Sequence, residues 1–478
     1  MTQVSVGEQL AAQGPNFYLP AATAFFRALR VYPAPSDLIV IYEKTIIEPI
    51  FKLVVELTQL DMKHRIEAYY DYFPPKKTNV SVDVREVTLG QKRQVLVVNK
   101  DFTAGEVIYK EFPVVTALDT DLLEKGTYCA HCLRAIQPGM SLKIPRDSNS
   151  VLNLTYCSKA CMVTSKNQSH SLLFTLESPL PSELPTPTLF TPTAQEARQR
   201  AQAKFAQFIK KEQRLAPLLV ARFIGRQVAL ETQKLVQASS MVEAAASSRV
   251  ENDYTDSDSD LEKYVLADHL ERLRYLEVVA NEEEMSLLTE ILANALPGLE
   301  EFITPEKYAT YIGKMAYNTF GVCYGGGRDD RPERTARPED VEKTRTPYGT
   351  QRQIGSALYT VSSYLTHSCQ PTVRPSFSLG TSEISIIANQ DLKKGDVLTV
   401  AFVDVTQHPG ESVVECRRRR RFELARGWRF SCGCERCAEE AKALSAEEKS
   451  SAAEELKDES KVEETVKKYT ESPAATVP

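Results

Sequence analysis

The pattern of hydrophobic positions changes near residue 75. Over residues 1–73, apolar side chains recur at intervals of three and four, which is the spacing of amphipathic helices, with breaks at Gly14-Pro15-Asn16 and Pro33-Ala34-Pro35. Beyond residue 75, β-branched residues and alternating hydrophobicity predict strands instead. We therefore expect an all-helical N-terminal module followed by a part that contains sheet. Its first strands are expected at 80–84, 95–98, 106–109 and 114–115.

Further along, the chain alternates between structured and linker-like segments. Five prolines exclude a helix over residues 175–193, and the helical pattern that follows is interrupted by the acidic stretch 251–260. Strand patterns return at 384–388 and 397–403. This mixture of helix and strand segments predicts an α+β fold. The expected segments are a Pro-rich connector at 176–199, a helical insert at 200–320, a linker at 321–345 and a charged tail at 441–478.

The second predicted helix carries a small–large–small spacing. Ala21, Phe25 and Ala28 follow one another at intervals of four and three residues, ahead of Pro33. This resembles the second helix of a tetratricopeptide unit, in which alanines let the paired helix approach closely. A single unit cannot bury its own apolar face, so we expect the helices between residues 36 and 61 to cover it.

The composition describes a multi-domain protein of slightly negative charge. It has 478 residues, with 58 Lys+Arg against 64 Asp+Glu and a net charge of -6, which excludes a protein whose main task is to neutralise nucleic-acid phosphates. No run of ~18 apolar residues and no secretory-signal pattern is found. The arginine run Arg417–Arg421 has two interpretations, a nuclear or phosphate-binding patch and a solvated helix face, and we expect the second.

Eight of the ten cysteines fall into close-spaced groups, which in a large chain of this kind indicates metal rather than disulfides. One group pairs Cys-x2-Cys with Cys-x3-Cys, and the other joins a Cys-x-Cys-x2-Cys triplet to one distant cysteine. Each group offers four thiolates for one tetrahedral zinc, and the alternative of buried reduced thiols does not account for the spacing. The expected zinc ligands are Cys129, Cys132, Cys157 and Cys161 for one ion, and Cys369, Cys432, Cys434 and Cys437 for the other.

The order of these motifs resembles that of SET-and-MYND proteins from about residue 78 to 440. Tyr156-Cys157-Ser158 matches the MYND zinc module, but its middle cysteine pair is missing and Phe174 stands where its last cysteine would be, so we expect half a module with one zinc. Thr366-His367-Ser368-Cys369 is similar to the Asn-His-Ser-Cys motif that joins the post-SET zinc site. The resemblance implies a SET N-terminal part at 78–126, a half-MYND insert at 127–175, a SET C-terminal part at 346–410 and a post-SET segment at 411–440.

Three positions depart from the chemistry of this family, whose members use S-adenosylmethionine to methylate protein lysines. Bulky side chains occupy Gly90–Val95, where the family has a Gly-x-Gly turn close to the cofactor. Thr366 replaces the cofactor-contacting asparagine, and Phe402 replaces a tyrosine whose hydroxyl helps orient the lysine amine. These changes put S-adenosylmethionine binding in doubt, and we expect a catalytically degenerate SET domain kept as a scaffold.

Alternatives to that interpretation remain open. Phe402, Thr366 and His367 are taken as vestigial positions, with His367 weighed as a packing residue against a cofactor-adjacent one. The competing hypothesis is an active S-adenosylmethionine-dependent protein-lysine methyltransferase in which Tyr359 or Tyr364 supplies the missing hydroxyl.

Residues 3–75 resemble the cytosolic domain of the presequence-receptor subunit of the mitochondrial outer-membrane translocase. Three short segments match the family in the same order: Val6-Gly7-Glu8-Gln9-Leu10, Phe25-Phe26-Arg27-Ala28-Leu29 and Glu48-Pro49-Ile50-Phe51-Lys52. The resemblance implies a receptor-like helical domain at 1–75 with a shallow apolar groove that receives an amphipathic targeting helix. The groove residues matched by position are Leu10, Leu38, Ile41 and Tyr42, and the alternative is that they pack the small core.

This second resemblance implies partners and a location. The partners would be amphipathic mitochondrial targeting peptides and other translocase subunits, with no nucleic acid, and the place would be the cytosolic face of the outer membrane. Family members begin with a membrane-spanning helix, whereas this sequence opens at Met1 within the first receptor helix. We therefore expect membrane association if an anchor lies upstream of Met1, and a soluble cytoplasmic protein otherwise.

Overall fold

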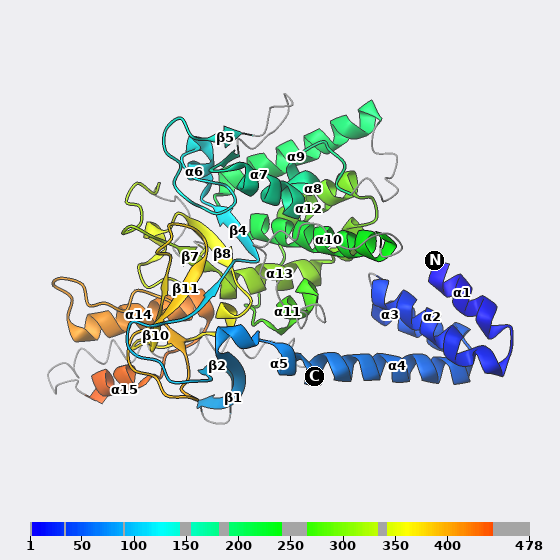
Figure 1. The fold of residues 1–478 in the computed structure, drawn as a ribbon, viewed down its shortest axis with the longest axis horizontal. Coiled ribbons are helices and arrows are strands. Elements are labelled where there is room, and N and C mark those ends of the chain that lie inside the picture. Colours follow the sequence, from blue (N-terminus) through cyan, green and yellow to red (C-terminus); the bar gives the residue numbers. More distant parts are fainter. Residues whose placement is uncertain are drawn as a thin grey trace. The chain divides into compact units, whose positions relative to one another are not determined.

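The computed structural model describes residues 2–32, 35–88, 91–143, 154–180, 191–240, 265–332 and 342–442 (Figure 1). The predicted acidic stretch 251–260 and nearly all of the tail from 441 to 478 lie outside the described residues. The chain forms two compact units, and each is described by itself. The first comprises Met1–Phe73 and Gly298–Thr304, and the second comprises Pro74–Pro297 and Pro305–Pro478.

The first unit is helical, as the apolar spacing predicts. Gly14 adopts a φ of 104°, which glycine tolerates, and Pro15 then begins the turn that leads into the second helix. Helix α1 packs on α2, and α2 packs on α3 and α4. The elements are α1 Thr2–Ala11, η1 Pro15–Phe17, α2 Tyr18–Val31, α3 Pro35–Thr45, α4 Glu48–Glu67 and α5 Tyr69–Tyr72.

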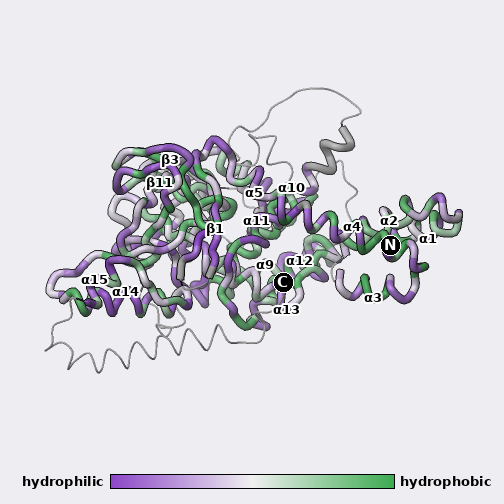
Figure 2. Tube along the Cα trace, turned by 90° about the horizontal axis from the view of Figure 1, so that it is seen from below, coloured by the Kyte–Doolittle hydropathy of each residue, from purple (hydrophilic) through white to green (hydrophobic). Residues whose placement is uncertain are grey.

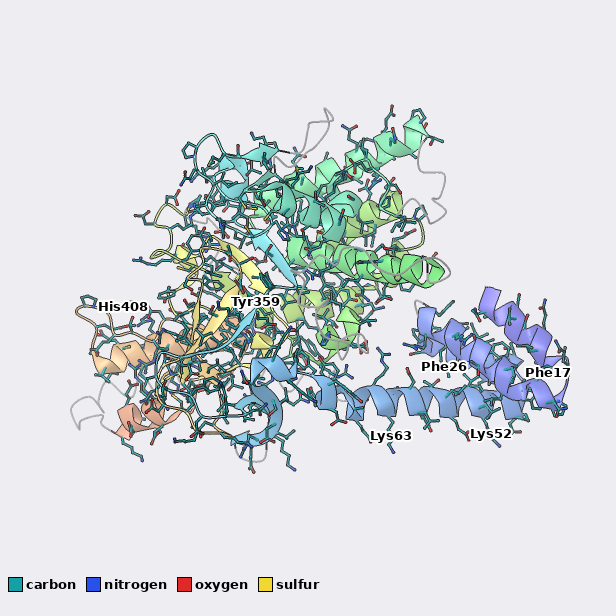
Figure 3. All side chains as sticks on the ribbon, viewed as in Figure 1. Phe17, Phe26, Lys52, Lys63, Tyr359 and His408 are labelled. Atoms are coloured by element: carbon teal, nitrogen blue, oxygen red, sulfur yellow. The ribbon has the colours of Figure 1, made fainter. Side chains whose placement is uncertain are left out.

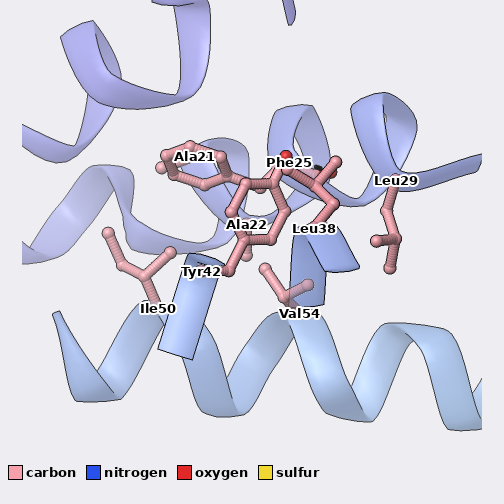
Figure 4. Packing of buried hydrophobic residues seen from close by; sticks show 8 residues of the cluster. All are labelled: Ala21, Ala22, Phe25, Leu29, Leu38, Tyr42, Ile50 and Val54. Atoms are coloured by element: carbon pink, nitrogen blue, oxygen red, sulfur yellow. Dashed lines mark hydrogen bonds between the residues drawn. The ribbon is translucent and has the colours of Figure 1, made fainter. Parts of the chain in front are cut away.

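The core of this unit is apolar and built around α2 (Figure 4). The rings of Phe25 and Tyr42 meet edge to face with centroids 5.2 Å apart, and the Tyr42 hydroxyl donates a hydrogen bond to the Phe25 carbonyl. A Cβ at Gly7 would lie 2.9 Å from the Phe25 ring, so glycine permits the close approach of α1 to α2. The tetratricopeptide-like interpretation stays a prediction. The core residues are Ala21, Ala22, Phe25, Leu29, Leu38, Tyr42, Ile50 and Val54.

The second unit contains several small sheets rather than one large one. The expected strands at 80–84 and 95–98 form an antiparallel hairpin, with Val80 opposite Val98. Two of the other sheets join segments that lie far apart in sequence, because β3 and β4, from before residue 120, pair with strands that begin at residue 320 or later. The sheets are β1 Val80–Thr88 with β2 Gln91–Val98, β3 Val107–Glu111 with β11 Ile384–Ala388 and β10 Val373–Ser376, β4 Val115–Leu118 with β8 Gly355–Leu358 and β7 Phe320–Val322, β5 Leu142–Lys143 with β6 Thr155–Tyr156, and β9 Thr366–His367 with β12 Thr399–Val400.

Strand pairing in the second unit is close where glycine allows it. A Cβ at Gly355 would lie 2.4 Å from the Ala117 carbonyl oxygen of the neighbouring strand. The expected strand at 397–403 is shorter in the structure, where β12 covers only Thr399–Val400 and Val397 makes an isolated bridge to Val97. The ladder with β9 ends there, because the Phe402 amide donates to the His367 side chain instead of to a neighbouring strand.

Helices fill the long segment between the sheet strands. The proline-rich connector was expected to reach residue 199, but α9 begins at Pro192, because proline is tolerated at the first helical position and the Thr191 side chain caps the helix. Residues 181–190 of the connector lie outside the described residues. The helices are α6 Thr120–Lys125, α7 Lys159–Ser165, η3 Lys166–His170, α8 Ser171–Phe174, α9 Pro192–Glu212, α10 Ala216–Ser240, α11 Leu266–Arg272, α12 Glu282–Ala295 and α13 Pro305–Asn318.

The C-terminal part of the second unit ends in two helices, α14 Val413–Trp428 and α15 Glu435–Lys442. Ser412 and Glu415 form a reciprocal capping box that begins α14. Figure 2 shows α14 as a largely hydrophilic segment. Short turns complete the described fold: η2 Lys76–Thr78, η5 Glu300–Phe302, η6 Thr350–Arg352 and η7 Ser362–Tyr364.

Candidate functional sites

The first cysteine group converges on one point in the second unit. The Sγ atoms of Cys129, Cys132, Cys157 and Cys161 all lie within 4.8 Å of one another. Cys157 follows β6, and Cys161 lies in the first turn of α7, where its amide donates to the Ser158 hydroxyl. A tight turn with Leu133 at a φ of 61° brings the other two thiols to the same place.

The second group is formed by residues much farther apart in sequence. Cys369 lies just after β9, 3.8 Å from Cys432 and 3.5 Å from Cys437 between Sγ atoms, and Cys434 completes the set. Arg436 donates to the carbonyl of Cys369 at 3.1 Å, which fixes the start of α15 against this segment. The group therefore joins the C-terminal helices to the body of the fold.

Both groups fit a zinc ion. Four sulfurs at the Zn–S bond length of about 2.3 Å in a tetrahedron are separated by about 3.8 Å. The Cys132–Cys157 and Cys157–Cys161 distances are 3.6 Å and 3.7 Å, and those of the second group are similar. Hydrogen bonds from neighbouring thiols lower the pKa of Cys434, as expected where several thiols compete to hold one thiolate. The eight predicted cysteines thus form two sites that could bind zinc.

Two of the five arginines of the run on α14 do not lie on the solvated face that was expected, whereas Arg418 is exposed. Arg417 and Arg420 are buried, and Arg417 donates to the Cys437 carbonyl at 3.2 Å. Arg420 contacts Glu440; burial acts to lower the pKa of Arg420, but the Cys369 and Glu440 charges together raise it. The expectation was wrong for these side chains because the post-SET cysteines fold back over the helix and cover them.

The vestigial positions of the SET resemblance pack against one another. The Phe402 amide donates to His367 Nδ1 at 3.1 Å, so the other ring nitrogen, Nε2, carries the proton and faces the Cys369 sulfur at 3.4 Å. Desolvation between Phe402 and Phe430 lowers the pKa of His367 to about 4. His367 therefore contacts a zinc-site cysteine and two aromatic rings.

A buried arginine that sequence reasoning missed stands over the Phe402 ring. The guanidinium carbon of Arg345 lies 4.3 Å from the ring centroid, and the residue is 1% exposed. Its nitrogens donate to the carbonyls of Tyr317 and Ser363 at 2.9 Å and 3.0 Å and to the Asn318 side chain at 3.0 Å. Burial lowers its pKa to about 9. Nothing in the local sequence indicates this role, because every contact comes from another segment.

A buried carboxylate holds the neighbouring loop. Glu111, at the end of β3, accepts hydrogen bonds from the Val361 and Ser362 amides at 2.8 Å and 2.9 Å and from the Ser362 hydroxyl. Burial raises its pKa, and these hydrogen bonds oppose that rise. The Tyr359 hydroxyl, inside the same unit in Figure 3, donates to the Ser382 carbonyl. The Tyr359 hydroxyl is therefore engaged. Tyr364 lines a cavity beside this loop.

That cavity is where the SET resemblance would place S-adenosylmethionine. It is a small hollow of about 20 Å³, and both Gln94 from the replaced Gly-x-Gly segment and Thr366 line it. Arg272, Arg274 and Arg345 also line it, and none of the lining residues is acidic. S-adenosylmethionine carries a sulfonium and an ammonium against a single carboxylate, so the residues present do not fit its charge.

The four predicted groove residues of the first unit have different environments. Leu38 and Tyr42 are buried in the core, 7% and 2% exposed, and Leu10 packs partly against that core. Ile41, on the other side of α3, is 48% exposed. Other large apolar residues exposed on this unit are Val6, Phe17, Leu19, Tyr32, Val40, Ile47, Leu60, Met62 and Ile66.

Comparisons with known proteins identify both units. Three features define a SET-type protein: the fold, the cysteine group that joins the C-terminal helices to the body of the fold, and the Thr-His-Ser-Cys segment. The SET domain family model matches residues 94–402. The chain belongs to the SET domain family. Residues 1–71 match the MAS20 protein import receptor family and form an import receptor domain at the N-terminus.

Individual relatives cover separate parts of the chain. The mitochondrial import receptor subunit tom20 of Neurospora crassa is 41% identical over 70 residues, 15% of this chain and 38% of the relative. Histone-lysine N-methyltransferase SET5 of Meyerozyma guilliermondii is 33% identical over 91 residues, 19% of this chain and 17% of the relative. Protein-lysine N-trimethyltransferase SMYD5 of Mus musculus is 29% identical over 87 residues, 18% and 20% of the two chains. The chain thus spans well under half the length of each of these relatives.

Proposed function

We propose that this protein binds amphipathic mitochondrial targeting helices through its N-terminal unit, and that its SET unit is a zinc-stapled scaffold without methyltransferase activity. The observation that carries the first half is an import receptor domain that leaves apolar side chains exposed around a filled core. By the same likeness we place the protein on the cytosolic face of the mitochondrial outer membrane, with translocase subunits as partners. Among the described residues, no helix is long and apolar enough to cross a membrane.

The exposed apolar side chains on and beside α3 suit a helix-in-groove partner. Val40, Ile41 and Ile47 are each nearly half exposed, although the core beside them is complete. Apolar side chains at this spacing can contact the i and i+3 or i+4 positions of an amphipathic helix. Residues 1–73 also contain more acidic than basic side chains, which favours the basic face of a targeting peptide.

A titration of the full chain with a fluorescent basic amphipathic peptide tests this half. We expect saturable binding that Ile41→Asp weakens about tenfold or more, because the charge is placed at the apolar contact. Leu60→Asp is the matched control, since Leu60 is 62% exposed on α4 and lies outside the proposed surface. No saturable binding, or equal losses in the two variants, would refute the proposed surface.

The second half of the proposal, a SET unit without methyltransferase activity, rests on the environment of Phe402. Its ring lies beneath Arg345, and the cavity that would take the cofactor gathers cations. A phenylalanine cannot donate the hydrogen bond that the family's tyrosine provides. Calorimetry of the full chain with S-adenosylmethionine should show no binding, and clear micromolar binding would overturn this proposal.

A second candidate function is lysine methylation. It is favoured by Tyr364, which lines the cavity beside Thr366 and could offer a hydroxyl in place of the missing one. Incubation with radiolabelled S-adenosylmethionine and basic protein substrates tests it. Transfer of label that Tyr364→Phe abolishes would establish this function. If no label is transferred, the proposal of a SET unit that acts only as a scaffold stands.

For the zinc ions, we propose one structural ion in each cysteine group. The half-MYND interpretation of the first group accounts for one ion there rather than two. Each ion would hold chain segments in place and take no part in chemistry, because four thiolates leave no open position for a substrate or water.

A further inference from the structure

Strand β1 forms an open edge of the second unit. Within the described residues it pairs only with β2, and no strand lies along its other side. The ladder is regular from Val80 to Glu86, and a bulge interrupts it between Glu86 and Thr88. An edge strand carries a row of main-chain donors and acceptors that another strand can complete. The regular part of β1 is therefore a candidate surface for strand addition.

Hydrogen bonds of β2 show which residues of β1 face this edge. The Leu96 carbonyl accepts a hydrogen bond at 2.8 Å from the amide of Leu398, which belongs to the segment on the other side of β2. Val82 lies opposite Leu96 in the ladder. In an antiparallel pair, opposite residues exchange main-chain hydrogen bonds or both turn away, and the two kinds of pair alternate. Val82 and Val84 therefore direct their amide and carbonyl groups to the open edge.

The middle of this edge is accessible. Val84 is 56% exposed, and the side chains of Asp83 and Arg85, on the other face of the strand, are 44% and 50% exposed. The Val84 amide donates to the Asp83 carboxylate at 2.8 Å rather than to a second strand. Arg85 pairs with the same carboxylate at 2.8 Å. The central amide thus has a local acceptor that it can exchange for the carbonyl of an added strand.

We infer that β1 pairs with β1 of a second copy of this chain, as antiparallel strands related by a twofold axis. Such an interface is built from the same surface of both copies, so the strand must be complementary to itself. The inference goes beyond the proposed function and depends on neither peptide binding nor cofactor binding.

The charges of β1 select one register for this pairing. Residues that face the edge must meet residues that face the edge, so the axis passes through one residue and its own counterpart. An axis at Asp83 or at Arg85 places like charges directly opposite, and an axis at Val82 places Asp83 opposite Ser81 without any charge pair. An axis at Val84 places Asp83 of each copy opposite Arg85 of the other. These are the non-hydrogen-bonded pairs, in which side chains approach most closely.

The selected register completes both faces of the joined strands. On one face, Asp83 and Arg85 of the two copies form a cluster of four alternating charges, which stabilises more than an isolated surface pair. On the other face, the exposed Val84 side chains meet across the axis. Residues 82–86 of each copy take part, which is less than a standard interface, so we expect a weak dimer that forms at high chain concentration.

Analytical ultracentrifugation of the full chain, up to ~100 µM, tests the inference. We expect a dimer whose fraction rises with concentration. Val84→Pro should abolish it, because proline removes the central edge amide and obstructs pairing, while the β1–β2 ladder does not use that amide. Val279→Pro is the matched control, since Val279 is 95% exposed and lies outside the strands. It should dimerise like the wild type.

A charge exchange tests the register without relying on proline. Asp83→Arg alone and Arg85→Asp alone should each weaken self-association about tenfold, because each places like charges opposite one another across the axis. An equimolar mixture of the two variants should regain the association of the wild type, since each supplies the charge that the other lacks. The charge pair within each strand stays broken in the mixture, so recovery reports the contact between copies.

The outcomes decide between this edge and other surfaces. A chain that stays monomeric over the whole range overturns the inference. It is equally overturned by a dimer that Val84→Pro leaves intact, or by a mixture that associates no better than the single variants. Slower hydrogen exchange at the Val82 and Val84 amides as the chain concentration rises supports strand pairing, and unchanged exchange there in a dimeric sample refutes it.

Discussion

The two units are stabilised in contrasting ways. The core of the first is eight apolar side chains, and the unit leaves further apolar side chains at its surface. The second buries charge, with Arg345 and Arg420 among its largest fully buried side chains, and Glu111 is fully buried as well. The comparison teaches that the first unit relies on apolar packing and keeps apolar side chains at its surface, whereas the second unit buries charged side chains that have hydrogen-bond partners from distant segments.

The buried charges of the second unit also act as long-range connections. Arg222 of α10 donates to the Thr116 carbonyl of β4, and Arg226 donates to the Val114 carbonyl at 2.7 Å. Each contact joins residues more than 100 positions apart. A guanidinium is suited to this because one side chain satisfies several carbonyls at once. In the first unit, helices α1 to α4 follow one another along the chain with short connections between them.

The largest expected effect concerns zinc, which should affect the second unit and spare the first. The full chain should contain two zinc ions, and Cys432→Ser should leave one, with loss of hydrogen-exchange protection over residues 411–440. Structural zinc sites contribute on the order of 10 kcal/mol of binding free energy, so unfolding of this segment is expected. Atomic emission spectroscopy and hydrogen exchange measure these outcomes.

The control for the zinc prediction is Cys323→Ser, which alters a buried cysteine outside both groups. It should retain two ions. If Cys432→Ser also retains two, or if protection is lost in α2 as strongly as in the C-terminal helices, the contrast between the units fails.

The next effect concerns the buried cation. Arg345→Met should lower the free energy of unfolding by about 3 kcal/mol, because several buried acceptors lose their donor at once. Arg345→Lys should recover only part of the lost free energy of unfolding, since an ammonium lacks the planar set of donors that a guanidinium offers. Urea unfolding measures both variants, and a change below about 1 kcal/mol for Arg345→Met would show that the buried charge is not structural.

A pH effect should also be confined to the second unit. Burial, with a further contribution from Arg272, lowers the pKa of His269 to about 4, against about 6.5 in an unfolded chain. The unfolded state therefore binds a proton in this interval while the folded state does not, so stability is complete above about pH 6.5 and falls as the pH falls toward 4. By pH 5 the loss is about 2 kcal/mol.

His269→Gln tests that pH effect by difference. The variant should be less dependent on pH between 7 and 5 than the wild type, as measured by urea unfolding at each pH. An identical pH dependence in the two proteins would assign the acid sensitivity to other groups.

The smallest effect tests the apolar unit. Tyr42→Phe should lower the free energy of unfolding by about 1 kcal/mol or less, because only one long hydrogen bond, 3.3 Å to the Phe25 carbonyl, is lost while the ring packing is kept. Helix-specific hydrogen exchange measures it. A loss as large as that of Arg345→Met would mean that the first unit also depends on buried polar contacts.

Local patterns predicted features that depend on neighbours in sequence. The spacing of Ala21, Phe25 and Ala28 predicted a buried helix face, and all three are buried. The cysteine spacings predicted the two groups of four, because chelating pairs two or three residues apart already fix half of each site. The substitutions Thr366 and Phe402 were likewise visible, because a resemblance identifies residue types at matched positions.

The tertiary structure decided the rest. Arg345 looks like an ordinary charged residue in the sequence, and only the folding of three separate segments around it makes it a buried donor over Phe402. The burial of Arg417 and Arg420 and the gathering of Arg272 and Arg274 in one cavity were equally hidden. The sequence by itself determined the two kinds of unit and their zinc-capable cysteines, because those follow from local spacing. Which charges are buried, and which share a cavity, depended on contacts between distant segments, because burial and Coulomb energy depend on distance in space rather than along the chain.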